Sequence, residues 1–131
     1  MAPRQSAGVA GQVTVAREDG TPLCDRCSLA DTPAGRLKGL LGRTGLERGE
    51  GLLLKPAPAI HTFFMRFPID AVFVDRDMRV VGVEPGLRPW RWASRRRARA
   101  VLELSAGESE RRGVQVGERL TLRTAEGRAQ A

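Results

Sequence analysis

The sequence predicts a mostly β fold: a single compact barrel-like or sandwich-like domain with one or two short helices. Fifteen glycines and eight prolines in 131 residues imply many turns, which favours short strands over long helices. Most apolar residues stand in short runs that these turn residues separate. A chain of this length typically forms one domain and buries roughly two-thirds of the surface that its unfolded form exposes, enough for a core without disulfides or metals.

The first elements are expected to form a hairpin. Residues 1–10 are mostly small and polar and predict a flexible leader. Apolar and polar residues alternate from Gln12 to Arg17, as in a strand with one buried face. Asp19-Gly20 is a typical hairpin turn, and Leu23 to Leu29 supplies the returning strand.

The strongest helix signal begins at Thr32. Its hydroxyl can cap the free amides of a helix, and Pro33 suits the first helical position. The helix is expected to run from Pro33 to Leu41 and to end at Gly42. Two internal glycines lower its intrinsic stability, so it must pack against the rest of the domain. Its apolar stripe consists of Ala34, Leu37, Leu40 and Leu41.

The centre of the chain predicts a hairpin of buried strands. Leu52 to Leu54 forms a short strand, and Ile60 to Met65 continues in extended structure after two prolines. Ile69 to Val74 is almost wholly apolar and predicts a buried strand, with Arg79 to Val83 as its partner across a tight turn. Pro68 lacks an amide donor and implies an edge, a bulge or a bend there.

Two further strands and a short helix complete the domain. Arg99 to Leu104 and Leu120 to Arg123 predict strands, and the stretch Ser105–Glu108 has the spacing of a capping box for one or two helical turns. The domain is expected to span residues 11–124, with a frayed tail at 125–131. The expected core is Leu40, Leu53, Phe64, Ile69, Phe73, Val81, Leu102 and Leu120.

Four segments resemble a known family. GRLKGLLGR, HTFFMRFPIDAVFVDRDMRVV, RAVLELSAG and GVQVGERL occur in the order and at the spacing of the domain of unknown function 192 family, between about Cys27 and Leu120. The resemblance implies a small, mostly β domain with one or two short helices. It implies no cofactor and no catalytic residues, because none are established for that family. Where the family commonly has Met-Lys-Asn-Thr, this chain has Met65-Arg66-Phe67-Pro68, which argues against a polar loop there.

Asp70 is the first candidate site residue, since it is a carboxylate among apolar neighbours. Such a group loses solvation unless a partner stabilises it. One interpretation is a functional carboxylate in a pocket, suited to acid–base chemistry or cation binding. The favoured alternative is a structural residue that ties the bend at Pro68 through backbone amides or an arginine. Arg66 reaches Asp70 only if Pro68 folds the chain back.

His61 is the only histidine and could act as a base that Asp70 orients. No spacing selects a nucleophile among the candidates Ser28, Thr62, Ser94 and Cys27. A lone histidine beside aromatic residues is more often a hydrogen-bonded packing residue. An enzyme is therefore the less favoured class.

Cys24 and Cys27 form a single C-x-x-C pair. Zinc sites of this spacing usually contain a second pair or two histidines, so a site built with His61 and a carboxylate is the weaker interpretation. A thioredoxin-like role needs the pair at the start of a helix, whereas this pair falls in a predicted strand. Two partly buried free thiols are expected, and neither a metal nor a cofactor.

The segment from Leu87 to Arg99 is the strongest signal for a partner. It contains Trp90 and Trp92 and no acidic residue, and without its arginines the formal net charge of +7 would be close to zero. Guanidinium groups match phosphates and indole rings stack on bases, so nucleic acid or another polyanion could bind here. The alternative is a loop over one end of the domain with solvated arginines. The arginines are Arg88, Arg91, Arg95, Arg96, Arg97 and Arg99.

The chain shows no run of signal-peptide or membrane-span length, which predicts a cytoplasmic protein without a membrane partner. We also expect a monomer. The favoured function is a non-enzymatic binding or accessory module, with a small cleft for an unknown ligand near His61, Asp70 and the Trp90/Trp92 loop. The alternatives are a polyanion binder that uses Arg88 to Arg99, and a small hydrolase or redox enzyme that uses His61 with Asp70 or Cys27.

Overall fold

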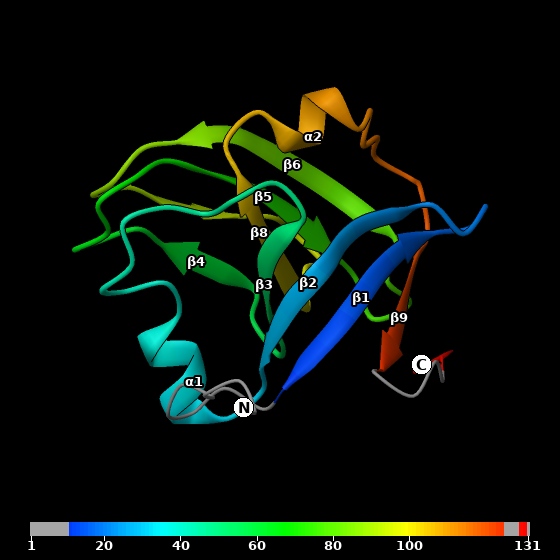
Figure 1. Ribbon diagram of the computed structural model, residues 1–131, viewed down its shortest axis with the longest axis horizontal. Helices are drawn as coiled ribbons and strands as arrows, with labels where there is room; N and C mark the ends of the chain where they lie inside the picture. The colour runs from blue at the N-terminus through cyan, green and yellow to red at the C-terminus, as the bar shows by residue number, and fades with distance from the viewer. Residues whose placement is uncertain (1–10, 125–128, 131) are drawn as a thin grey trace.

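The computed structural model describes residues 11–124 and 129–130 of the chain. The predicted leader and most of the predicted tail lie outside these residues. Short strands dominate the fold, as the glycine and proline content predicts, and two short helices accompany them (Figure 1). In chain order the elements are β1 (Gln12–Arg17), β2 (Pro22–Ala30), α1 (Pro33–Lys38), β3 (Glu50–Leu54), β4 (Ala59–His61), β5 (Ile69–Val74), β6 (Val80–Leu87), β7 (Trp92–Ser94), β8 (Ala100–Ser105), α2 (Glu108–Arg111), β9 (Leu120–Thr124) and β10 (Ala129–Gln130).

Eight strands form one mixed sheet in the order β10-β9-β1-β2-β3-β8-β5-β6, and β4 and β7 form a second, two-stranded sheet. All neighbours in the large sheet are antiparallel except β2 and β3, which α1 connects. The large sheet curls until the beginnings of β6 and β9 meet, where Arg79 bridges Arg119 and the Leu120 amide donates to the Met78 carbonyl oxygen at 2.9 Å. The strands β6 and β10 at its ends do not pair, so the domain is sandwich-like rather than a closed barrel.

The two faces of the curled sheet hold separate cores. The inner cluster joins buried residues of β1, β2, β3, β5, β6, β8 and β9, among them Val15, Leu53 and Leu102. The outer cluster lies between β3, β5 and β8 on one side and β4, β7 and the segment that follows α1 on the other, and it includes Leu40 and Phe73. The central strand β5 is consequently buried at every residue, as predicted for Ile69 to Val74.

The first helix is shorter than predicted. Thr32 caps it as expected, because its hydroxyl oxygen accepts the Gly35 amide at 3.0 Å. It ends at Lys38, before the predicted Leu41, because Gly39 adopts a φ of 48° and closes the last turn on the Gly35 carbonyl oxygen. Gly42 therefore does not end the helix, contrary to the prediction from the sequence.

The predicted core is correct at six positions and wrong at Phe64. Its side chain is 70 % exposed, because β4 ends at His61 and the chain turns at Thr62–Met65 instead of continuing as a strand. Met65, which follows Phe64, is buried in its place. Val81 is only partly buried at the edge of the outer cluster.

The second helix also differs in its start. It begins after Gly107 rather than at the predicted Ser105 cap, and none of its own side chains caps it. Asp70 of β5 caps the helix instead, as described below. Part of the predicted frayed tail, Ala129–Gln130, pairs with β9.

Candidate functional site

A cavity of about 250 Å³ lies between the end of α1, the strand β4 and the outer face of β8. In Figure 1, α1 and β4 lie one below the other at the left of the molecule. The walls are mainly apolar and include Leu40, Leu54, Ile60 and Met65. The polar side chains that line it are those of Arg36, His61 and Glu103. Of the features near which a cleft was predicted, only His61 lines this cavity; Asp70, Trp90 and Trp92 do not.

Glu103 is the most unusual residue of this cavity. It lies on β8 between Leu52 of β3 and Ala71 of β5, and only 4 % of it is exposed. No described residue forms a hydrogen bond or an ion pair with its carboxyl group. Burial of the charged form raises its pKa to about 8. The carboxyl is therefore mostly protonated at neutral pH, and it can donate one hydrogen bond and accept others.

Sequence analysis did not identify Glu103 as a site residue. The signal was present in the segment VLEL, where Glu103 shares one strand face with Val101 while Leu102 and Leu104 occupy the other. An acid on a strand with two apolar faces is expected to be buried. Recognising that both faces of this strand are covered requires the three-dimensional structure, in which β4, β7 and the segment after α1 cover the second face.

His61 lies at the rim of the cavity and is exposed. Its ring stacks on Phe63, with centroids 4.9 Å apart, and its Nδ1 accepts the Phe63 amide at 3.3 Å. The structure does not bring it together with its proposed partners. Asp70 is wholly buried in contact with α2, and Cys27 lies in the inner core, so neither lines the cavity.

Asp70 connects three segments of the backbone. Its Oδ1 accepts the Gly86 amide at 2.8 Å, and its Oδ2 accepts the Gly107 amide at 3.1 Å and both the amide and the hydroxyl of Ser109, at 2.8 and 2.6 Å. Gly86 lies in an irregularity of β6 opposite Asp70 and has a φ of 58°. Asp70 is tied to backbone amides, as the favoured interpretation expected, but these amides belong to β6 and to the start of α2 rather than to the bend at Pro68, and Arg66 is not among its partners. Asp70 thus caps α2 from outside the helix.

Both cysteines are buried free thiols in the inner core. A register shift between β1 and β2 turns Cys24 and Cys27 toward the same side, although they are three positions apart in the sequence. The neighbouring Cys24 thiol, together with burial, raises the pKa of Cys27 well above its ordinary value. This disfavours a thiolate nucleophile. Among residues 11–124 and 129–130, no three or more His, Cys, Asp or Glu side chains are grouped to hold a metal ion.

Thr62, another nucleophile candidate, joins two loops. Its buried hydroxyl donates to the Arg88 carbonyl oxygen at 2.6 Å and accepts the Arg91 amide at 2.9 Å. Its own amide donates to the Arg91 carbonyl oxygen at 2.7 Å. The hydroxyl is committed to these contacts, and the remaining candidates, Ser28 and Ser94, lie outside the cavity lining.

The predicted tryptophan–arginine segment divides into structural and exposed residues. Arg95 forms an ion pair with Glu84 at 3.0 Å and lies 5.1 Å from the ring centre of Phe73, so it is a packing residue rather than an anion ligand. Trp90 and Trp92 are more than half exposed and do not cover the cavity. The other arginines of the segment, Arg88, Arg91, Arg96, Arg97 and Arg99, are exposed.

Neither helix of the described residues is long and apolar enough to cross a membrane.

Comparisons with known proteins agree with the fold. The chain is similar to the crystal structure of a protein of unknown function from Novosphingobium aromaticivorans DSM 12444, at 26 % identity and a TM-score of 0.72, over 91 % of this chain and 99 % of that one. It is also similar to a candidate transcription regulator from Sinorhizobium meliloti 1021, at 25 % identity and a TM-score of 0.74, over 88 % and 96 % of the two chains.

No curated protein matches the chain. The sequence profile of one family, described as uncharacterised ACR, matches residues 14–122. This match covers the same segments that carry the resemblance, and it extends over most of the chain. The protein belongs to the domain of unknown function 192 family.

Proposed function

We propose that the protein is a binding module that holds a small, mainly apolar molecule in the Glu103 cavity, with one polar group of the ligand against the carboxyl. The observation that carries the proposal is the carboxyl group of Glu103, which lines the cavity from a residue only 4 % exposed and has no partner among the described side chains. Burying such a group without a hydrogen bond is costly. A ligand that supplies the missing partner recovers this cost, which gives the cavity both affinity and orientation for it.

The protonation state of Glu103 selects the ligand class. With a pKa of about 8, the carboxyl is mainly neutral at pH 7 and pairs best with an amide or a hydroxyl group rather than with a cation. The cavity of about 250 Å³ is smaller than the roughly 300 to 1000 Å³ of sites for drug-sized ligands. A compact ligand with one amide or hydroxyl group fits both the volume of the cavity and the protonation state of Glu103.

Benzamide and benzylamine, which are similar in size, provide the test. Shifts in the NMR spectra of the isotope-labelled protein at pH 6.5 are expected with benzamide, and they should centre on Leu40, Ile60 and Met65. Binding should weaken above pH 8, when the carboxyl ionises. Glu103→Gln, which keeps a donor and an acceptor, should retain binding, whereas Glu103→Leu should weaken it by about tenfold.

Glu110→Gln is the matched control, because Glu110 is an exposed acid on α2. It should leave the benzamide titration unchanged. Shifts caused by benzylamine alone, growing with pH, would show that a carboxylate rather than a carboxylic acid forms the site and would contradict the proposal. So would the absence of any benzamide shift around the cavity.

A further inference from the structure

We infer that a second site, on the surface beside the cavity, binds single-stranded nucleic acid. Its centre is an aromatic row, which consists of the exposed rings of His61, Phe63, Trp90 and Phe64. Two loops that are distant in sequence contribute to it. The inference does not depend on the ligand of the Glu103 cavity, although His61 borders both sites.

The rings of the aromatic row are in contact and open to solvent. The centroids of Phe63 and Trp90 are 5.9 Å apart with planes inclined by 28°, and His61 stacks on Phe63 at a similar inclination of 27°. Phe64 packs on Trp90 at 4.7 Å in a tilted arrangement. Exposed fractions are 40 % for Phe63, 70 % for Phe64 and 56 % for Trp90. Such surfaces accept unpaired bases by stacking, without regard to sequence.

The backbone holds these rings outward. Thr62 fastens the two loops through the hydrogen bonds described above, and the Trp90 amide donates to the Thr62 carbonyl oxygen at 3.0 Å. Phe64 and Trp90 both adopt positive φ angles, 67° and 66°, which are unfavourable for bulky residues. Strained backbone of this kind persists where the surroundings enforce it and is concentrated at functional sites. The row is therefore ordered before any ligand arrives.

The charge of this surface suits phosphates. The segments 51–69 and 85–102, which contain both loops, carry no acidic residue. They contribute eight basic residues, so the rest of the chain has almost no net charge. Arg66, Arg88 and Arg91 are exposed and lie within three residues of the rings in sequence. A single strand that stacks its bases on the row can place its phosphates against these guanidinium groups.

The composition of the patch favours bases over an apolar partner. Every large exposed hydrophobic residue on these two loops is aromatic, and the one aliphatic example among the described residues, Val116, belongs to the loop before β9. A membrane or an apolar protein face can be contacted by aliphatic as well as by aromatic side chains. Stacking on a base requires a ring.

Fluorescence anisotropy of a 5′-labelled twelve-nucleotide oligo(dT) with the whole protein tests the inference. We expect binding that weakens with salt, with a slope of log K against log salt concentration of about −2 if Arg66, Arg88 and Arg91 each neutralise one phosphate. Trp90→Ala should reduce affinity by about fivefold or more, as loss of one stacked base does. A duplex of the same length should bind more weakly, because its bases are already stacked.

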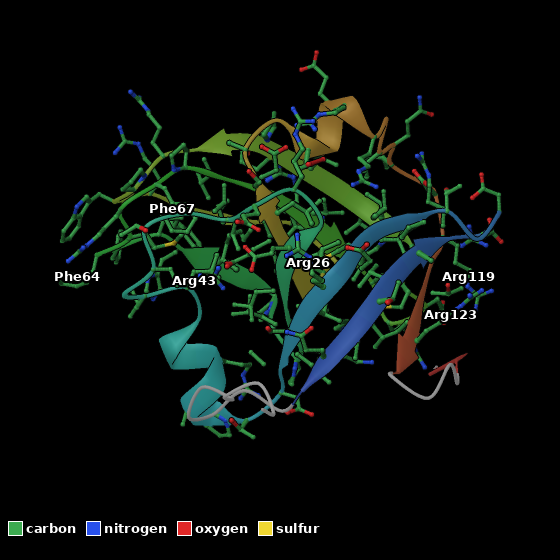
Figure 2. The ribbon with its side chains drawn as sticks, in the orientation of Figure 1. Arg26, Arg43, Phe64, Phe67, Arg119 and Arg123 are labelled. Atoms are coloured by element: carbon green, nitrogen blue, oxygen red, sulfur yellow. The ribbon has the colours of Figure 1, made fainter. Side chains whose placement is uncertain are left out.

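The controls separate stacking and local charge from the overall positive charge. Arg88→Gln with Arg91→Gln should make the salt slope shallower by about 1.4. Arg119→Gln with Arg123→Gln removes the same charge from the end of the molecule opposite Phe64 and should change the slope little (Figure 2). Circular dichroism checks that each variant is folded.

Three results would overturn the inference. The first is equal affinity for single strand and duplex, and the second is an equal effect of the two arginine pairs. The third is preferential binding to vesicles of anionic phospholipid that Trp90→Ala abolishes, since this would identify the row as a membrane contact. Glu103→Gln should leave oligonucleotide binding unchanged, so the outcome is independent of the cavity.

Discussion

The buried carboxyl of Glu103 links proton binding to folding. Its pKa is about 8 in the folded chain against an ordinary value of 4.5, so the folded state binds the proton more tightly than the unfolded state. The stability that this difference provides is complete below pH 4.5 and is lost as the pH rises toward 8. The loss is about 1.4 kcal/mol per pH unit, or up to about 5 kcal/mol over the whole interval.

Glu103→Gln should remove this pH dependence. We expect the variant to match the parent protein near pH 4 and to exceed its free energy of unfolding by up to about 5 kcal/mol at pH 8.5, because glutamine has no charge to bury. Urea unfolding at a series of pH values measures the difference. If the free energies of unfolding of the two proteins changed in parallel with pH, the pKa of Glu103 would not be raised by folding.

At the scale of elements, most strands follow from local sequence and the exceptions follow from tertiary contacts. The segment from Gln12 to Arg17 and the buried strand from Ile69 have the predicted bounds, because their apolar patterns agree with the sheet that surrounds them. The segment Thr62–Met65 is equally apolar, yet it forms a turn that Thr62 stabilises through a distant loop. No local pattern distinguishes an exposed aromatic turn from a buried strand.

The candidate site was less predictable than the fold, because it too depends on tertiary contacts between segments that are distant in sequence. His61 was identified by its chemistry, and the structure places it at a cavity, but Glu103 became visible only when the covering layer was known. The capping box expected at Ser105 fits its pattern, yet α2 uses a carboxylate from β5 instead. Asp70 and Ser109 are 39 residues apart in the sequence, so the spacing of neighbouring residues does not predict their contact.

Asp70→Ala tests this connection between β5, β6 and α2. Removing the carboxylate leaves the buried amide and hydroxyl of Ser109 and the Gly86 and Gly107 amides without their acceptor. The free energy of unfolding is expected to fall by about 3 kcal/mol or more. Thermal and urea unfolding measure the change. Asp77→Ala, which alters an exposed acid in the turn before β6, should stay within about 0.5 kcal/mol of the parent, and equal stability of the two variants would contradict the anchoring role.

At the scale of the whole molecule, the curled sheet and its outer layer differ in how firmly they are held. The strands β5 and β8 pair on both edges and are covered on both faces. The outer layer consists of the short helix α1 and a two-stranded sheet with three residues in each strand. Residues of α1 and β4 form part of the wall of the Glu103 cavity, so local opening of this layer would admit a ligand without disturbing the sheet.

Native-state hydrogen exchange should resolve this difference. Amides of β5 and β8 are expected to exchange only through global unfolding, with protection that falls steeply as denaturant is added. Amides of β4 and β7 should exchange through local opening that depends little on denaturant, because few residues are exposed when these strands separate. If β4 and β7 were protected as strongly as β5, the outer layer and the sheet would open as one unit. A ligand could then reach Glu103 only through the opening that the cavity already has.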